Sequence, residues 1–512
     1  MSRHRFYITT AIPYVNGDPH IGFALECVQA DVLARHRRVR GDAVRFLSGT
    51  DDNSLKNVEA ATAAGLQVAE FVNAKAARFA ALRDPLELSY DDFIRTSVDG
   101  RHRPGVERLW RACAAAGDLY ERDYEGLYCV GCEAFVSPDE LIDGLCPEHG
   151  VPPEHVAERN WFFRLSRYQD ELRLLIESGR LRVEPGHRRN EALSFIASGL
   201  ADFSVSRSRE RVQGWGIPVP GDASQVIYVW FDALANYLTA LDYGTDGERY
   251  ATWWKGADER IHVIGKGILR FHAVYWPAIL LSAGEPPPAT IFVHDYVTVD
   301  GLKLSKSRAV DGDPSALAAR YGTDALRWWF LRDVPRAGDA DFREEQLAAR
   351  ANELADELGN LVNRTITLVN RFRPGGVDAS AAPPDEADPL LIAVAQGPGS
   401  IAEALDRFDF RAATSSLWNV VTEANRFVST TRPWELGKAE GGGDATAARR
   451  LDNVLVALLE ACRATARELR PFLPAAAVRI EQALEQRDVE LGRNLFPKAQ
   501  VPTQAAAKRR AP

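Results

Sequence analysis

The stretch Asp18-Pro19-His20-Ile21-Gly22-Phe23 connects a predicted strand to a predicted helix. Residues 6–10 before it are β-branched and aromatic, as in a buried strand, and apolar residues recur at helical spacing after it. We expect Asp18 to cap the helix, Pro19 to take its first position and the first turn to begin near His20. Unpaired N–H groups and the positive end of the helix dipole favour a phosphate at this turn. Taken alone, the turn is weak evidence for a ligand, and a structural role would be favoured if no other feature converged on it.

The bulk composition indicates a large globular protein of the cytoplasm. A length of 512 residues suggests three or four domains. No apolar run reaches the roughly 18 residues that cross a bilayer, and no signal peptide is recognisable, so we expect no membrane association. The 6 cysteines are too few for a disulfide scaffold, which favours a reducing compartment. A net charge of −9 argues against a non-specific nucleic-acid coat but leaves local RNA binding open.

The first 115 residues alternate strand-like and helix-like patterns. A strand at 44–47 runs into Gly49-Thr50-Asp51-Asp52-Asn53, and helices are expected at 54–64, 67–81 and 101–116. This alternation predicts βαβ units and a parallel sheet. Ligands of such sheets bind beyond the carboxyl ends of the strands. Asp51 and the opening stretch are therefore expected to face one crevice.

A possible metal site interrupts this pattern between about 116 and 225. Cys129-x-x-Cys132 is followed, after thirteen intervening residues, by Cys146-x-x-His149. Two close pairs of thiolate and imidazole ligands suit tetrahedral zinc. With no open catalytic position recognisable, the expected zinc is structural; the alternative is four unrelated reduced side chains.

Alternation returns between about 226 and 325. Strands are expected at 226–230, 261–264 and 291–293, with helices at 231–241 and from Gly265-Lys266-Gly267 to about 281. The Gly-Lys-Gly is not a P-loop, because Arg260 stands where its first glycine should be. A basic loop follows, Gly301-Leu302-Lys303-Leu304-Ser305-Lys306-Ser307-Arg308, which could also be an ordinary solvated turn.

The remainder of the chain is predicted to be helical. Apolar residues share helical faces from about 351 to 500, as in an antiparallel bundle. Connectors rich in Pro, Gly or Ala fall near 373–389 and 437–447. Residues 501–512 are expected to be a disordered tail.

Two of these stretches resemble the signature motifs of class I aminoacyl-tRNA synthetases: His20-Ile21-Gly22 and Lys303-Leu304-Ser305-Lys306-Ser307. Further stretches resemble the methionyl-tRNA synthetase family in particular. They are Thr10-Ala11-Ile12-Pro13-Tyr14-Val15-Asn16-Gly17, Tyr228-Val229-Trp230-Phe231-Asp232-Ala233, His262-Val263-Ile264-Gly265-Lys266, Phe292-Val293-His294-Asp295-Tyr296-Val297-Thr298-Val299 and Arg432-Pro433-Trp434. The resemblance covers about residues 5–500.

The resemblance implies an α/β fold and a division into domains. A Rossmann-type catalytic domain would comprise 1–115 and 226–325, and a zinc-bearing connective insertion would comprise 116–225. A stem-contact junction at 326–350 would lead into an α-helical anticodon-binding domain at 351–500.

The implied activity is a methionine–tRNA ligase. ATP and L-methionine would form methionyl-adenylate, and the methionyl group would move to the 3′ end of tRNA(Met). Mg²⁺ would accompany ATP, one structural Zn²⁺ would be held per chain, and a monomer is expected. The catalytic residues implied are His20, Lys303 and Lys306. The ATP-binding residues implied are Asp18, His20, Gly22, Phe23, Gly265, Lys303, Ser305 and Lys306.

The same resemblance implies which residues bind methionine and which bind the anticodon. Asp51 would bind the ammonium group. The thioether pocket implied consists of Ala11, Ile12, Tyr14, Trp230, Tyr237, Ile268 and His272. A hydrogen bond to sulfur from Tyr14 or His272 would sharpen selection, although without the family Trp230 and Tyr237 would be read as ordinary core. Trp434 is the candidate for base stacking, and Asn360, Asn363 and Arg364 are candidate hydrogen-bonders that could equally be a polar helix face.

Four positions depart from the family pattern. Phe23 and Asn53 stand where histidine is usual, Leu234 where proline is frequent, and Gly267 where aspartate is frequent. We expect an active but divergent enzyme, with altered sensitivity to inhibitors that mimic the adenylate. Two alternatives remain: a ligase that acts on an acceptor other than tRNA, and an inactive RNA-binding paralogue.

Overall fold

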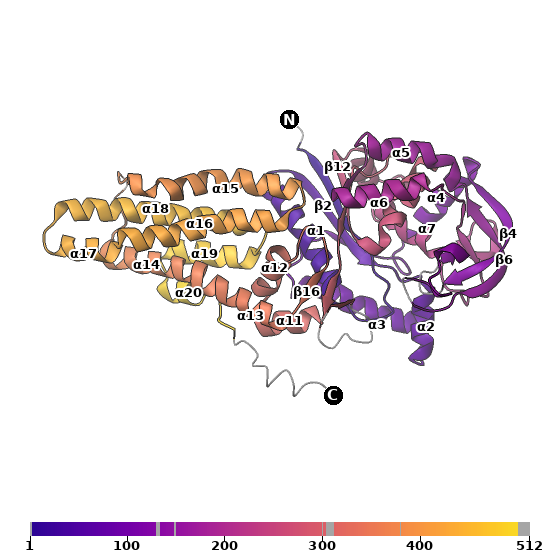
Figure 1. The fold of residues 1–512 in the computed structure, drawn as a ribbon, viewed down its shortest axis with the longest axis horizontal. Helices are drawn as coiled ribbons and strands as arrows, with labels where there is room; N and C mark the ends of the chain where they lie inside the picture. The colour runs from indigo at the N-terminus through magenta and orange to yellow at the C-terminus, as the bar shows by residue number, and fades with distance from the viewer. Residues whose placement is uncertain are drawn as a thin grey trace. The chain divides into compact units, whose positions relative to one another are not determined.

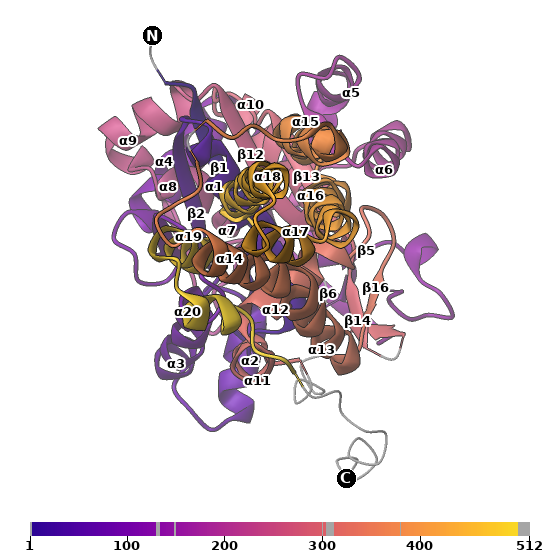
Figure 2. The ribbon, with the colours of Figure 1, turned by 90° about the vertical axis from the view of Figure 1, so that its left-hand side faces the viewer.

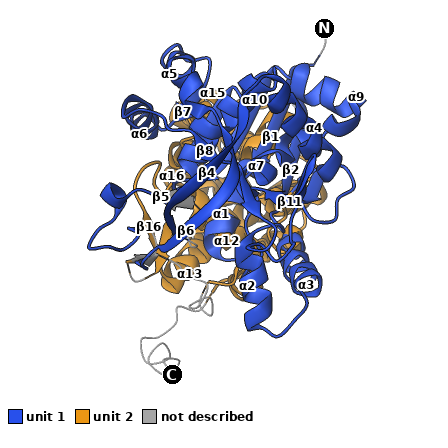
Figure 3. Ribbon diagram, turned by 90° about the vertical axis from the view of Figure 1, so that its right-hand side faces the viewer, with its two compact units in different colours: residues 1–30, 40–82, 89–294 blue, residues 31–39, 83–88, 295–512 orange. Residues whose placement is uncertain are grey.

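The computed structural model describes residues 3–129, 134–147, 150–299, 301–303, 312–378 and 380–499; for 134–135 and 302–303 only the backbone is described. The chain divides into two compact units (Figure 3). The first unit comprises Met1–Ala30, Arg40–Leu82 and Ser89–His294, and the second Asp31–Val39, Arg83–Leu88 and Asp295–Pro512. Among the residues that the structure describes, no helix has the length and apolar character needed to span a membrane.

A 6-stranded parallel sheet forms the centre of the first unit, in the order β3-β2-β1-β12-β13-β7. The strands are β1 (Arg5–Thr10), β2 (Ala43–Thr50), β3 (Asp92–Arg95), β7 (Arg182–Glu184), β12 (Glu259–Gly265) and β13 (Thr290–His294). In register, Ile8 of β1 lies between Phe46 of β2 and Ile261 of β12. The prediction of one parallel sheet built from two distant parts of the chain is confirmed.

Helices connect the first strands as the alternation predicted. They are α1 (Ile21–Val39), α2 (Leu55–Ala63), α3 (Val68–Ala80) and α4 (His102–Ala115). The expected helices at 54–64, 67–81 and 101–116 are thus confirmed to within one residue at each end.

The strand expected at 226–230 is wrong in extent, and the observed strand is not part of the parallel sheet. β11 (Asp222–Ile227) ends before Tyr228, which is the N-cap of α7 (Val229–Leu234); α8 (Asn236–Thr239) follows. β11 pairs with β9 (Ser206–Ser208) and β10 (Pro218–Val219) in a separate antiparallel sheet. The run of aromatic and β-branched residues has strand propensity, but tertiary packing places its second half in a helix.

The connective region forms its own sheet and also extends the large one. Its 4-stranded antiparallel sheet has the order β5-β4-β6-β8. The strands are β4 (Leu119–Cys129), β5 (Ala134–Val136), β6 (Glu154–Phe163) and β8 (Phe203–Ser204). Helices α5 (Gln169–Glu177) and α6 (Gly186–Ala197) lie between β6 and β8 in the chain. The short β7 pairs with β13 at the edge of the parallel sheet, which the sequence did not predict.

The second unit combines a small sheet with a helical bundle. Its 3-stranded sheet has the order β15-β14-β16, from β14 (Val297–Val299), β15 (Leu302–Lys303) and β16 (Ala340–Phe342). The helices are α11 (Pro314–Tyr321), α12 (Thr323–Arg332), α13 (Glu344–Glu353), α14 (Asn360–Phe372), α15 (Asp388–Asp406), α16 (Phe410–Thr431), α17 (Pro433–Gly441), α18 (Ala445–Leu469), α19 (Pro474–Gln486) and α20 (Val489–Arg493).

The long helices of the bundle lie side by side. Helices α15, α16 and α18 run alongside one another in Figure 1 and are seen end-on in Figure 2. The predicted bundle is confirmed. The connector expected at 437–447 is too long, because α17 continues to Gly441 and α18 begins at Ala445.

Candidate functional site

The turn after β1 is capped by His20 and not by Asp18. Phe23 and Ala24 donate their N–H groups to the His20 carbonyl, and the Gly22 N–H donates to His20 Nδ1 at 3.1 Å. The Asp18 carboxylate instead pairs with Lys75 at 2.8 Å and Arg78 at 2.6 Å. Two basic side chains of α3 compete for Asp18, and the histidine ring supplies the cap.

Gly22 leaves room for the His20 ring. A Cβ atom at Gly22 would lie 3.0 Å from two atoms of the imidazole. Phe23, next in the chain, is buried and packs edge-on against Phe79 with ring centroids 5.3 Å apart. Phe23 therefore contributes apolar packing between α1 and α3.

The ends of β1 and β2 meet as expected. The Asp51 N–H donates to the Pro13 carbonyl at 2.9 Å, and Asp51 forms an isolated parallel bridge with Tyr14. The Asp51 side chain is buried and its Oδ1 accepts the Asn53 N–H at 3.1 Å. A carboxylate is thus held directly beside the segment that follows β1.

Four aromatic side chains, Tyr14, Trp230, Tyr237 and His272, form a connected group that we call the aromatic cluster. The ring centroids of Tyr14 and Trp230 are 6.2 Å apart, and those of Trp230 and His272 are 6.4 Å apart. Tyr237 Oη lies 2.8 Å from His272 Nε2. The cluster begins at Tyr14, which pairs with Asp51, so the two ends of the predicted methionine site are contiguous.

The protonation of His272 follows from its two partners. Nδ1 lies 2.9 Å from the Ile268 carbonyl, which can only accept, so Nδ1 carries the hydrogen. Burial lowers the pKa of His272 to about 4, so the ring is neutral at physiological pH and Nε2 accepts from Tyr237. With its single N–H committed to Ile268, His272 is not placed to donate to a thioether, which leaves Tyr14 as the candidate donor.

The buried histidines make the stability of the first unit depend on pH. For His272, the unfolded chain takes up a proton below about pH 6.5 while the folded chain does not until about pH 4, so stability is fully present above pH 6.5 and is lost as the pH falls. The loss is about 2 kcal/mol between pH 7 and pH 5. Burial also lowers the pKa of His262, with the same sign. Urea midpoints at pH 5, 6 and 7.5 measure this loss, and His272→Gln should flatten the slope; an unchanged slope would contradict the assignment.

Sequence reasoning missed Glu26, which joins several parts of the site. Its Oε1 accepts the Ala11 N–H at 2.7 Å, its Oε2 lies 3.0 Å from His294 Nε2, and it also accepts from the Gly265 backbone. Burial raises the pKa of this carboxyl, and the hydrogen bonds oppose the shift. The position of Glu26 among the buried apolar residues of α1 was the available signal.

The second signature motif is described only in part. The backbone of Lys303 pairs with Thr298 across β15 and β14, while Ser305 and Lys306 lie outside the described residues. The predicted zinc ligands are divided in the same way. Cys129 and Cys146 are both buried, and Cys132 and His149 lie outside the described residues. In the described ranges no group of three or more His, Cys, Asp or Glu side chains is arranged to hold a metal ion.

The anticodon candidates lie on α14 and α17. Asn360 and Arg364 are exposed, and Trp434 is 37% exposed, which is unusual for so large an apolar side chain. Gly437 of α17 lies against the Phe372 ring, where a Cβ atom would clash. Gly437 therefore meets α14 at Phe372, eight residues and about 12 Å along the helix axis from Arg364. The candidate residues are thus spread along α14 and α17.

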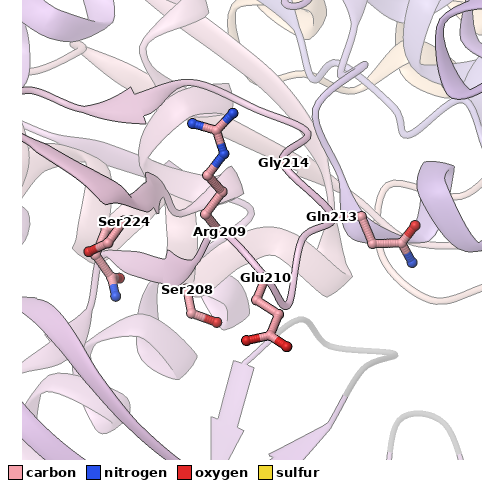
Figure 4. Close-up of a pocket in the computed structure, with 7 residues that line it drawn as sticks. Ser208, Arg209, Glu210, Gln213, Gly214 and Ser224 are labelled. Carbon is pink, nitrogen blue, oxygen red and sulfur yellow. The ribbon is translucent and has the colours of Figure 1, made fainter.

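An open depression of about 690 Å³ lies elsewhere in the first unit, in the connective region (Figure 4). Its lining is polar and contains none of the predicted site residues: Ser208, Arg209, Glu210, Gln213, Gly214, Ser224 and Gln225.

A family model described as tRNA synthetases class I (M) matches residues 6–152 and 136–366. Together with the parallel sheet and the residues assembled at its carboxyl edge, this match defines a class I aminoacyl-tRNA synthetase. The methionine–tRNA ligases of Caldanaerobacter subterraneus subsp. tengcongensis and Brucella suis biovar 1 are each 40% identical to the chain. The first alignment covers 92% of this chain and 72% of the relative, and the second 94% and 92%. The chain belongs to the methionyl-tRNA synthetase family.

A solved structure agrees over the whole length. Mycobacterium tuberculosis methionyl-tRNA synthetase in complex with methionyl-adenylate superposes with a TM-score of 0.89 at 37% identity, covering 98% of each chain.

Proposed function

We propose that the protein is a methionine–tRNA ligase, which activates L-methionine with ATP and transfers it to tRNA(Met). The observation that carries the proposal is the continuity between the buried Asp51 carboxylate and the aromatic cluster through Tyr14. A carboxylate at one end and polarisable rings at the other suit an amino acid whose side chain is a thioether.

In the first step, a methionine carboxylate oxygen attacks the α-phosphorus of ATP, the bond to the β,γ-pyrophosphate breaks, and methionyl-adenylate forms. The nucleophile is already ionised, so no general base is required. Catalysis then depends on positioning and on stabilising charge on the phosphates. His20 at the start of α1 is one such group, and Lys303 and Lys306 of the second motif are the others.

Methionine is held at both ends. Asp51 accepts from the ammonium group, and the aromatic cluster with Ala11, Ile12 and Ile268 encloses the thioether. Apolar enclosure alone separates substrates by about 1–3 kcal/mol per methylene. Because His272 uses its N–H on Ile268, any hydrogen bond to sulfur would come from Tyr14.

In the second step, a ribose hydroxyl of the terminal tRNA adenosine attacks the methionyl carbonyl carbon, and AMP leaves. Trp434 would stack on an anticodon base while Asn360, Asn363 and Arg364 read base edges. We further propose that the enzyme works in the cytoplasm and that the chain is divided into the domains given above.

Two metal ions belong to the proposal. Mg²⁺ would bind as part of the ATP substrate and neutralise its phosphates. Zn²⁺ would be held by Cys129, Cys132, Cys146 and His149 and would stabilise the connective region. The burial of Cys129 at the end of β4 and of Cys146 fits thiolate ligands. We expect about one zinc per chain by metal analysis, and Cys129→Ser should lower it; zinc-free protein with unchanged stability would contradict the site.

Methionine-dependent exchange of pyrophosphate into ATP tests the first step, and charging of tRNA with a CAU anticodon tests the second. Exchange without charging would favour a ligase for another acceptor, and absence of both would favour an inactive paralogue. Loss of charging when the anticodon is changed supports the anticodon assignment.

The contact at Gly22 gives a prediction for the ATP site. In Gly22→Ala, the new Cβ lies 3.0 Å from the His20 ring, so the imidazole must move. We expect kcat for exchange to fall by about 10- to 100-fold, since small displacements of a positioning group are costly. The methionine KM should be little changed. A variant with wild-type kcat would show that the observed position of His20 is not needed.

A further inference from the structure

A buried carboxylate lies behind the aromatic cluster without being part of it. Asp232 is on α7, two residues after Trp230, and is 1% exposed. Its Oδ1 lies 2.5 Å from His102 Nε2 on α4, and its Oδ2 accepts from Asn53 Nδ2 at 2.7 Å. A buried carboxylate requires such partners.

Asn53 connects this carboxylate to the one in the site. Its side-chain amide donates to Asp232, and its backbone N–H donates to Asp51 Oδ1 at 3.1 Å. One residue therefore contacts the group proposed to bind the ammonium and the helix that carries Trp230. The Asn53 side chain is an uncharged donor to the Asp232 carboxylate.

Both sides of this connection are firmly anchored. His102 is buried and its Nδ1 lies 2.8 Å from Thr239 Oγ1, which fixes the ring to α8. Next to Asn53, the buried Asp52 accepts from Arg95 and from Ser97. Asn53 thus spans two rigid elements, and its amide sets how they meet.

We propose that Asn53, supported by the Asp232–His102 pair, is a positioning residue that sets the separation of Asp51 and Trp230 and thereby the affinity for methionine. This rests on the proposed function. Asn53 is not assigned contact with either substrate; it acts through Asp51 and through α7. Its loss should therefore affect methionine and leave ATP binding unchanged.

Asn53→Asp is the sharpest test, because it keeps the shape and replaces the donor by an acceptor opposite Asp232. We expect the methionine KM in the exchange assay to rise roughly 10- to 100-fold, as for loss of a buried hydrogen bond to a charged group. The ATP KM should stay within about twofold of the wild type. Asn352→Asp on α13, whose amide donates to Ala499 at 3.2 Å, is the matched control and should leave both constants unchanged.

A double variant that combines Asn53→Asp with Asp232→Asn exchanges the two groups and tests the contact itself. In the double variant, the amide at 232 can donate to the carboxylate at 53, and its oxygen can still accept from His102. We expect its methionine KM to lie nearer the wild type than that of Asn53→Asp alone.

The outcomes are distinct. A methionine KM unchanged in Asn53→Asp, an equal rise for methionine and ATP, or no recovery in the double variant overturns the positioning role. If Asn53→Asp does not fold, Asn53→Ser is judged on the same comparison of the two KM values. Absence of methionine-dependent exchange in the unaltered protein overturns the proposed function instead.

Discussion

Replacing Asp51 by Asn is expected to lower kcat/KM for methionine in the exchange reaction by about 10²- to 10³-fold. Asp51 is 1% exposed, so the proposed ion pair with the substrate ammonium would be shielded from water. Removing one charge of such a pair costs roughly 2–5 kcal/mol. Asparagine keeps the shape and retains an Oδ1 that can accept the Asn53 N–H, so the effect should reflect the lost charge.

A substrate analogue separates this effect from local disruption. The α-hydroxy analogue of methionine lacks the ammonium, so the wild type should discriminate strongly against it and Asp51→Asn should discriminate much less. Asp123→Asn, exposed on β4, is the matched control and should behave as the wild type. If Asp51→Asn kept the full preference for methionine over the analogue, another residue would have to bind the ammonium.

Helices and strands whose apolar residues repeat at a regular spacing were predictable from the sequence. The alternation around β1, α1 and β2 gave the parallel sheet, and the spacing of apolar residues gave the bundle. β7 was not predictable, because three residues carry too little pattern to reveal pairing with β13. β11 was assigned to the wrong sheet, since strand propensity says nothing about which strand is the partner.

Within the site, residues in short motifs were predictable, but the residues that hold them in place were not. Asp51 and Tyr14 follow adjacent strands, and the topology alone brings them together. The contact between Asn53 and Asp232 joins residues 179 positions apart. The local sequence around either residue does not indicate this contact. The same holds for Glu26 and His294, 268 positions apart. The cap of α1 was misassigned because the ion pairs of Asp18 with α3 are equally non-local.

Arg327→Met is expected to destabilise the second unit by about 3–5 kcal/mol, the usual cost of breaking a buried ion pair. Arg327 of α12 is fully buried, and its Nη2 lies 2.8 Å from Asp31 Oδ2. Its other nitrogens donate to the carbonyls of Leu86 and Phe472, each at 2.8 Å. Methionine fills similar volume but leaves these acceptors without their donor. Because Asp31 keeps Arg35 as a second partner at 2.8 Å, the loss should fall towards the lower end of the range.

Urea denaturation of the full chain measures the effect, with Arg320→Met as the control. Arg320 pairs with Glu344 at 2.7 Å, but its side chain is 44% exposed, and exposed pairs contribute about 0–1 kcal/mol. The same substitution in the same unit should therefore give a large loss at 327 and a small one at 320. Adding Asp31→Leu to Arg327→Met should recover part of the loss, because an apolar pair leaves no buried charge between them. Equal midpoints for the two arginine variants would mean that the buried network contributes no more to stability than a surface ion pair.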